Sequence, residues 1–275
     1  MTKNQSEEFE VRSDTQYLSK CLIQVKDICE KHDLFFWLNY GALLGMVREN
    51  RLLPWNNDVE LGCWAHETSN EKIRNVADAL IDLGYTCFYY SSFGTLNIKK
   101  GDGVDININL YWCSGEFAVR PHETASKYQD DNFFASMFYW LAVLIFMYPN
   151  TFIQLSKRKR KKDLVKVAIS RGFSHFNLPT RRKFFDTFLN WSKLCGGVYH
   201  QTAIPKSFFN SFKILSFYGS EMNLPAHSED LLAFIYGDDW CTPKDKWSFY
   251  EESNKSQTSI VFIEESFNYN NIDLE

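Results

Sequence analysis

The chain has 275 residues, a formal net charge of −4 at pH 7, and a hydrophobic content of 45%. This length and composition predict a folded protein with a sizeable core, either one large α/β domain or a domain with an appended lobe. The small net charge points to no particular partner. The aromatic content of 17% is high, which favours a surface where aromatic rings meet an interface.

The number and spacing of the cysteines favour neither a disulfide framework nor a zinc site. Seven are present, an odd number, and no two have the spacing of a CxxC motif. Neither a disulfide framework nor a zinc site is therefore indicated, and reduced thiols in a cytosol are expected. The polar N-terminus has no apolar run after its first charges, so a cleaved secretory signal is not expected and the site should face the cytosol.

Helical and strand-like segments interleave along the first half of the chain. Periodicity predicts a helix over 13–31, a short strand over 34–38, a turn with a short helix over 41–49, a strand over 59–64, a helix over 68–83, and strands over 85–90, 94–99 and 104–112. This order predicts an α/β (α+β) fold, in which helices flank a mixed sheet.

Two carboxylates occupy alternate positions at the start of the strand over 59–64. One apolar residue separates Asp58 from Glu60, which is the period of a strand, so both side chains should leave the same face. Two carboxylates on a rigid strand are a typical protein contribution to a Mg²⁺ site, since substrate phosphates and water complete the shell. An exposed edge strand that carries charge for solubility is the alternative interpretation.

The character of the chain changes past residue 130. Residues 133–148 are apolar at every position except Ser136, as expected of a helix that is fully enclosed or in contact with lipid. These 16 residues rise about 24 Å at ~1.5 Å each, short of the ~30 Å hydrocarbon core, so a full span is not expected. Six consecutive cations follow at 157–162, and together the two features favour a monotopic or re-entrant contact with an anionic membrane surface.

Other interpretations of residues 133–162 remain open. The helix could form the core of a helical lobe, the basic run could be a solvated loop, or the run could bind nucleic acid or direct nuclear import. A further helix over 180–194 carries aromatic residues opposite three cations, which suits either a core or a headgroup layer.

Three segments form an ordered pattern. Residues 37–62, WLNYGALLGMVRENRLLPWNNDVELG, contain Tyr-Gly-x-Leu-Leu-Gly-x-x-Arg, then Pro-Trp, then alternating acids. Residues 103–111, GVDININLY, carry one Asp among β-branched residues, and residues 227–247, HSEDLLAFIYGDDWCTPKDKW, contain Tyr-Gly, Asp-Trp and Pro. In this order they resemble the LicD and fukutin-related phosphotransferases. The resemblance implies a nucleotidyltransferase-like fold, a mixed sheet flanked by helices.

The resemblance also implies a reaction. A phosphorylated alcohol, such as phosphocholine or ribitol 5-phosphate, would move from a CDP-linked donor to a sugar hydroxyl of a glycan or glycolipid. Asp58, Glu60 and Asp105 would hold a divalent cation, Mg²⁺ or Mn²⁺, and Asp105 would accept the proton of the acceptor. A strand Asp bonded to a neighbouring turn is the alternative for Asp105.

Further residues are expected at the substrate: Tyr40, Gly41, Arg48, Trp55 and Asn56. Gly41 would let the backbone approach a phosphate at a helix N-terminus, and Arg48 would either clamp the diphosphate or pair with Glu60. Tyr40 and Trp55 either pack to set the turn or stack on a cytosine.

The chain departs from the family pattern at its acidic positions. The family commonly has Asp-x-Asp-x-Asp after Pro-Trp, whereas this chain has Asn56, Asp58 and Glu60. Asn56 offers a neutral carbonyl oxygen, and Glu60 is longer by one methylene. We expect an active enzyme; the alternative is a catalytically weakened or silent membrane-bound module that binds nucleotide or glycan.

The predicted organisation has three parts. Residues 1–130 form the nucleotidyltransferase-like core, 131–226 a helical, apolar and basic lobe that associates with membrane, and 227–275 a segment that packs back on the core. The expected location is the cytoplasmic face of a membrane, as a peripheral or monotopic protein. The expected partners are the CDP-linked donor, the acceptor and an anionic membrane surface bound through 133–162, with no nucleic acid.

Overall fold

A computed structural model of the chain describes residues 15–54, 58–90, 94–101, 103–125, 133–147, 152–153, 172, 175–196, 199–243 and 261–262. Its strands are β1 (Trp37–Leu38), β2 (Val59–Trp64), β3 (Thr86–Tyr90), β4 (Thr95–Lys100), β5 (Val104–Ser114), β6 (Phe117–Ala125), β7 (Phe152–Ile153), β8 (Tyr199–Pro205), β9 (Phe212–Phe217), β10 (Ser220–Pro225) and β11 (Val261–Phe262). Its helices are α1 (Thr15–Lys31), α2 (Tyr40–Glu49), α3 (Asn70–Asp82), α4 (Phe133–Met147), α6 (Leu178–Leu194) and α7 (Ser228–Tyr236), with short 3-10 turns η1 (Ala65–Glu67) and η4 (Lys206–Phe209).

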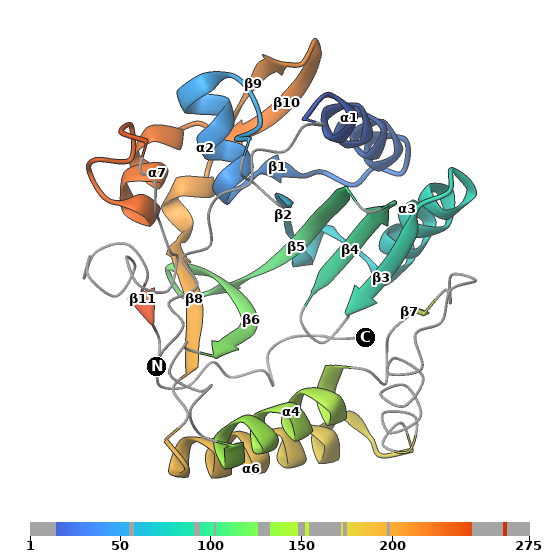
Figure 1. The fold of residues 1–275 in the computed structure, drawn as a ribbon, viewed down its shortest axis with the longest axis vertical. Coiled ribbons are helices and arrows are strands. Elements are labelled where there is room, and N and C mark those ends of the chain that lie inside the picture. Colours follow the sequence, from blue (N-terminus) through green and yellow to red (C-terminus); the bar gives the residue numbers. More distant parts are fainter. Residues whose placement is uncertain are drawn as a thin grey trace, which may run out of the picture.

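A mixed sheet runs through the centre of the molecule (Figure 1). Its strand order is β11-β8-β6-β5-β4-β3-β7, with β2 beside β5 and β1 beside β2. The β2 and β5 strands are parallel, whereas β4 is antiparallel to β5. Because β5 is 11 residues long, its earlier part pairs with β2 and β4, and its last three residues pair with β6. The predicted mixed sheet flanked by helices is therefore confirmed.

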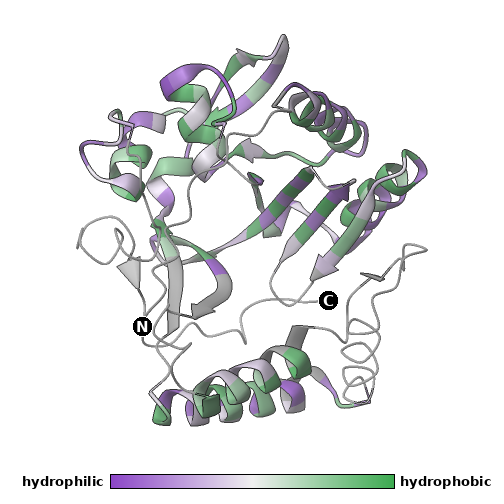
Figure 2. Cartoon of the chain, in the orientation of Figure 1, coloured by the Kyte–Doolittle hydropathy of each residue, from purple (hydrophilic) through white to green (hydrophobic). Residues whose placement is uncertain are grey.

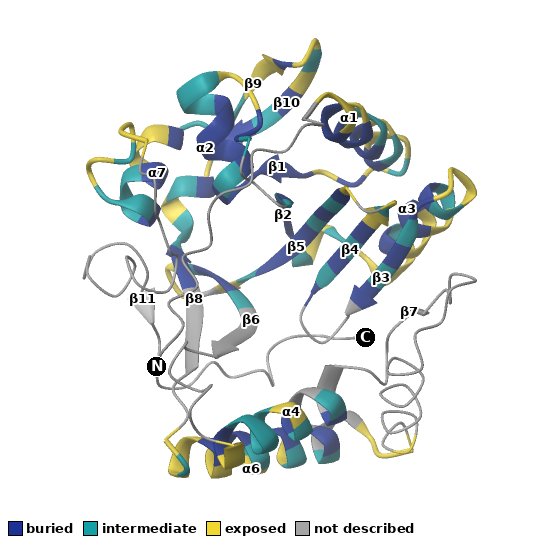
Figure 3. Ribbon diagram, viewed as in Figure 1, coloured by how far each residue is buried: buried dark blue, intermediate teal, exposed yellow. Residues whose placement is uncertain are grey.

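The two faces of this sheet differ in polarity, because apolar and polar residues alternate along 104–110. Residues Val104, Ile106, Ile108 and Leu110 of β5 are buried in the main core. Helices α1 and α3 pack near them, against β5 and β3. The intervening side chains of β5 and β4 form a polar face, visible as the alternating bands in Figure 2, while Figure 3 shows the buried positions between them. The candidate functional site lies on this polar face.

Most predicted elements lie within one or two residues of the observed ones. Strand β2 covers the predicted range 59–64, and α3 lies within the predicted range 68–83. Helix α3 begins after Ser69, because the Ser69 side chain accepts a hydrogen bond from the Lys72 amide at 3.1 Å and caps the helix. The predicted strand over 34–38 is too long. Only Trp37 and Leu38 find partners in β2, so β1 has two residues.

Helices α4 and α6 form a pair beside the sheet, in the lower part of Figure 1. The predicted helix over 133–148 is confirmed as α4, and that over 180–194 as α6. Their buried side chains, which include Ala142 and Phe185, do not belong to the main core cluster. Within the described ranges no helix has the length and apolar character needed to cross a membrane. The cations at 157–162 lie outside the described residues, and the predicted domain boundaries stay predictions.

Candidate functional site

Asp58 and Glu60 lie on the polar face where β2 runs parallel to β5. Glu60 is level with Asn107 in the strand register. The Nδ2 atom of Asn107 donates to Asp58 Oδ2 at 3.4 Å, and Nδ2 of Asn109 donates to Glu60 Oε1 at 3.3 Å. Both predicted carboxylates thus face the same side of the sheet, and each is matched by an asparagine of β5.

The polar network continues from β5 onto β4. Asn97 Nδ2 donates to Asn107 Oδ1 at 2.6 Å and to Asp105 Oδ1 at 2.8 Å. Lys99 Nζ contacts Asp105 Oδ2 at 2.6 Å, as both a hydrogen bond and an ion pair. Asp105 therefore lies on the same polar face, with one oxygen bonded to an amide and the other to an ammonium group.

These contacts bear on the predicted three-carboxylate metal site. Among the described residues, no three His, Cys, Asp or Glu side chains gather closely enough to hold a metal ion. Asp58 and Glu60 supply the right donors, because two carboxylates suffice when phosphates and water complete the shell. Asp105 Oδ2 is paired with Lys99 instead. The donor chemistry thus fits a cation at Asp58 and Glu60, and the metal site itself stays a prediction.

An arginine that the sequence did not single out lies beside Glu60. Nη1 of Arg120, on β6, is 3.6 Å from Glu60 Oε1. Burial raises the pKa of Glu60 to about 7, although the charge of Arg120 and the hydrogen bond from Asn109 act in the opposite direction. Within the described part of the chain, the buried Nε atom of Arg120 has no hydrogen-bond partner. Arg120 thus keeps one N–H donor for an anionic ligand.

The start of α2 adds two tyrosines to the same site. Asn39 caps the helix: its Oδ1 accepts from the Tyr40 amide at 3.1 Å, and its Nδ2 donates to the Tyr111 hydroxyl at 2.8 Å. Tyr40 has a φ of 43°, in the left-handed region that non-glycine residues rarely adopt. Burial raises the pKa of Tyr40, as do its neighbours Tyr111 and Glu60. Buried contacts therefore hold Tyr40 in a strained turn beside Glu60.

Helix α7 reaches the site through its last residue, Tyr236. Burial raises the pKa of its phenol, the charges of Glu60 and Asp58 raise it further, and Arg48 lowers it. These electrostatic effects place Tyr236 near both acids. The sequence pointed to its segment through the Tyr-Gly of residues 227–247, but did not assign Tyr236 to the site.

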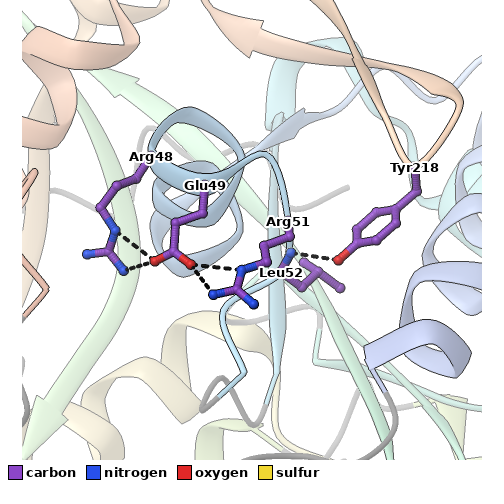
Figure 4. Close-up of polar contacts among 5 residues, drawn as sticks. All are labelled: Arg48, Glu49, Arg51, Leu52 and Tyr218. Atoms are coloured by element: carbon purple, nitrogen blue, oxygen red, sulfur yellow. Dashed lines mark hydrogen bonds and ion pairs between the residues drawn. The ribbon is translucent and has the colours of Figure 1, made fainter.

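Arg48 pairs with its neighbour Glu49 at the end of α2 (Figure 4). Its Nε and Nη2 atoms donate to Glu49 Oε1 at 3.1 and 2.7 Å, while Arg51 donates to Glu49 Oε2 at 2.8 and 2.7 Å. Tyr218, on the turn between β9 and β10, accepts a hydrogen bond from the Leu52 amide at 2.9 Å and fixes the chain just beyond. Glu49 is thus one structural partner of Arg48, and a diphosphate contact stays a prediction.

The other predicted substrate residues are placed only in part. Gly41 lies in the first turn of α2 and is half-buried. Trp55 and Asn56 lie outside the described residues, so their roles stay predictions.

The site thus has two acids, Asp58 and Glu60, beside the start of α2 on one face of a mixed sheet. The family model for LicD/FKTN/FKRP, nucleotidyltransferase domain, matches residues 33–180, more than half of the chain. The chain therefore belongs to this family of transferases, which confirms the resemblance seen in its motifs.

The chain was also compared with solved structures and with curated proteins. One similar solved structure is ANT(2")-Ia in complex with adenylyl-2"-tobramycin, with 10% sequence identity and a TM-score of 0.30, covering 64% of this chain and 98% of that chain. A likeness of this degree supports no argument about the site. A comparison with curated proteins found no significant match.

Proposed function

We propose that the protein is a phosphotransferase that moves a phosphorylated alcohol from a CDP-linked donor to a sugar hydroxyl of a glycan or glycolipid. Family membership supports transferase activity. The observation that carries the proposal is the pair of carboxylates, Asp58 and Glu60, which share one polar face with a half-buried arginine, Arg120, beside them. Acids and a cation at one place are what a diphosphate donor and its metal require.

The proposed cofactor is Mg²⁺ or Mn²⁺, with Asp58 and Glu60 as its protein ligands and Asp105 as the third ligand predicted from sequence. When bound, the ion would neutralise negative charge on the donor's diphosphate. The amides of Asn107 and Asn109 would orient the two carboxylates, because each already donates a hydrogen bond to one of them.

The donor would be held by groups at the edge of this face. Arg120 has a buried Nε without a partner among the described residues, and a charge-assisted bond to a phosphate oxygen would satisfy it. Tyr40 and Tyr236 lie near Glu60 and would line the space around the transferred group. Arg48 would add positive charge from the end of α2.

The acceptor hydroxyl must lose a proton, and Asp105 is the proposed base. Its two oxygens are bonded to Asn97 and Lys99. An acceptor hydroxyl would therefore replace one of these contacts and place its proton within hydrogen-bond reach of the carboxylate.

The test is transfer by Asp58→Asn. We expect a loss of CMP release from CDP-choline or CDP-ribitol of at least roughly 100-fold, the size expected when a charged group in the transition state is lost. Asp82→Asn changes an exposed acid of α3 in the same way and should leave the rate unchanged. Equal rates in both variants would remove Asp58 from the mechanism.

A second candidate function is nucleotide or glycan binding without transfer. The pairing of Glu60 with Arg120 favours it, since a protein cation already stands beside one of the two acids. Replacing both departures from the family pattern, Asn56→Asp and Glu60→Asp, should then create activity in a chain that binds CDP but does not turn over. Continued silence of the double variant would argue against this route.

A further inference from the structure

The pair formed by α4 and α6 exposes an unusual amount of apolar surface. The α4 sequence, FFASMFYWLAVLIFM, contains no charged residue. Phe133 is 73% exposed, Trp140 52% and Leu194 85%, and Phe134 and Trp191 are also exposed. Several large exposed apolar side chains on one pair of helices indicate a binding surface.

The contacts between the two helices show how this surface is arranged. Ser192 donates a hydrogen bond to the carbonyl of Ala135, and the rings of Phe138 and Trp191 lie 5.4 Å apart, edge to face. The start of α4 therefore lies beside the end of α6, so the helices run antiparallel. The exposed residues Phe133, Phe134, Trp191 and Leu194 gather at this end.

A buried cation lies near the opposite end of α6. Arg181 is only 6% exposed, and within the described residues its Nε and Nη1 atoms have no hydrogen-bond partner. Buried N–H donors without a partner are costly, and burial lowers the pKa of this guanidinium. An anion bound at these two atoms would satisfy them.

The start of α6 favours an anion for a second reason. Asn177 caps this helix of 17 residues, and its first turn contains no acidic residue. The unpaired backbone N–H groups and the helix dipole make such a terminus positive, and cations there are unfavourable unless a negative group is bound. Arg181, Arg182 and Lys183 nevertheless follow in sequence at this end.

We propose that the α4–α6 pair docks the protein on an anionic phospholipid bilayer, with its exposed aromatic residues in the interfacial layer and a lipid phosphate bound by Arg181. Charge complementarity supports this occupant. The six cations at 157–162, outside the described residues, fall between α4 and α6 in the sequence, so positive charge and apolar surface belong to one stretch. This inference goes beyond the proposed phosphotransfer and does not rest on it.

Sedimentation with lipid vesicles tests this proposal on the full chain. Vesicles of phosphatidylcholine alone are compared with vesicles that also contain phosphatidylserine, and binding is expected only to the second kind. Arg181→Met should lower the partition coefficient roughly fivefold, the effect of one cation at a membrane surface. Phe133→Ser with Trp140→Ser should lower it roughly tenfold through lost apolar burial. Ile214→Ser, which removes a 60% exposed side chain of β9 away from the pair, should leave it unchanged.

Several results would overturn the proposal. One is equal binding of the wild type and both helix variants. Another is self-association in the absence of lipid that Phe133→Ser/Trp140→Ser disperses, since the apolar surface would then bind a second copy. Retention on short duplex DNA without vesicle binding would assign the charge to nucleic acid, and binding of inorganic phosphate alone would reduce Arg181 to a soluble-anion site. If Arg181→Met does not fold, the double variant decides the outcome.

Discussion

Arg120 and Glu60 face each other where β6 approaches β2, with Nη1 of the arginine 3.6 Å from Oε1 of the carboxylate. The two residues come from segments 60 positions apart, and both are largely buried. Because the arginine also keeps an unpaired Nε, it can hold Glu60 and bind a further anion at the same time.

Replacing Arg120 by Met should weaken use of the donor. The loss of one charge-assisted hydrogen bond is worth about 1.5–3 kcal/mol, so kcat/KM for a CDP-linked donor should fall roughly 10- to 150-fold. Arg120→Lys should recover only part of this, since an ammonium group lacks the planar fork. Lys31→Met, at an exposed cation at the end of α1, serves as the control, and an unchanged kcat/KM in Arg120→Met would remove Arg120 from donor binding.

Two measurements distinguish a catalytic role of Asp105 from a structural one. If it accepts the acceptor proton, Asp105→Asn should lower kcat by roughly 10²–10⁴-fold while the dissociation constant for CDP is unchanged. If its only role is to bond Asn97 and Lys99, the same variant should lower the denaturation midpoint with kcat nearly intact. Lys99→Met is the companion variant, because it removes the ammonium group and keeps the carboxylate.

Glu49 should make folding stability depend on pH. Burial acts to raise the pKa of Glu49, but hydrogen bonds from Arg51 and Arg48 outweigh it, so the pKa lies below the ordinary value of 4.5. Folding therefore favours the ionised carboxylate, and its contribution is present above about pH 4.5 and is lost as the pH falls through the folded-state pKa.

Urea denaturation of Glu49→Gln checks this pH dependence. At pH 7 the variant should be about 1 kcal/mol less stable than the wild type, and the gap should close in acid. A gap that persists unchanged in acid would show that Glu49 acts through packing and not through charge.

Gly62 should be intolerant of a side chain. A Cβ atom there would lie 2.4 Å from the ring of Trp37, which is its partner in the register of β1 and β2. Gly62→Ala should therefore cost about 1–3 kcal/mol in the free energy of unfolding, the usual price of overpacking. Gly103→Ala is the matched control, because a Cβ there meets nothing within 4 Å. Equal stability of the two variants would contradict the packing described for Trp37.

The local features of this fold could be predicted from sequence, and the long-range ones could not. The alternation in 104–110 and the spacing of Asp58 and Glu60 are properties of single strands, so they indicated the correct faces. The register that brings Asn107 and Asn109 to those acids depends on pairing between segments about 49 residues apart in the chain, which periodicity does not encode.

Arg120 and Tyr236 were missed for the same reason. Each comes from an element outside the acidic motif, and only the packing of β6 and α7 brings them to it. Arg48 belongs to the motif, and the sequence offered no reason to pair it with its neighbour Glu49, since adjacent residues on a helix do not ordinarily face each other. The pairing is possible at the end of α2, where Arg51 returns to the same carboxylate.

Phosphorus-31 NMR of a CDP-linked donor mixed with a sugar acceptor follows the proposed phosphotransfer itself. With the wild type and Mg²⁺, we expect CMP to appear together with a new phosphodiester signal, and neither should form with Asp58→Asn. A phosphodiester that forms equally fast with Asp58→Asn would contradict phosphotransfer at the Asp58 and Glu60 face.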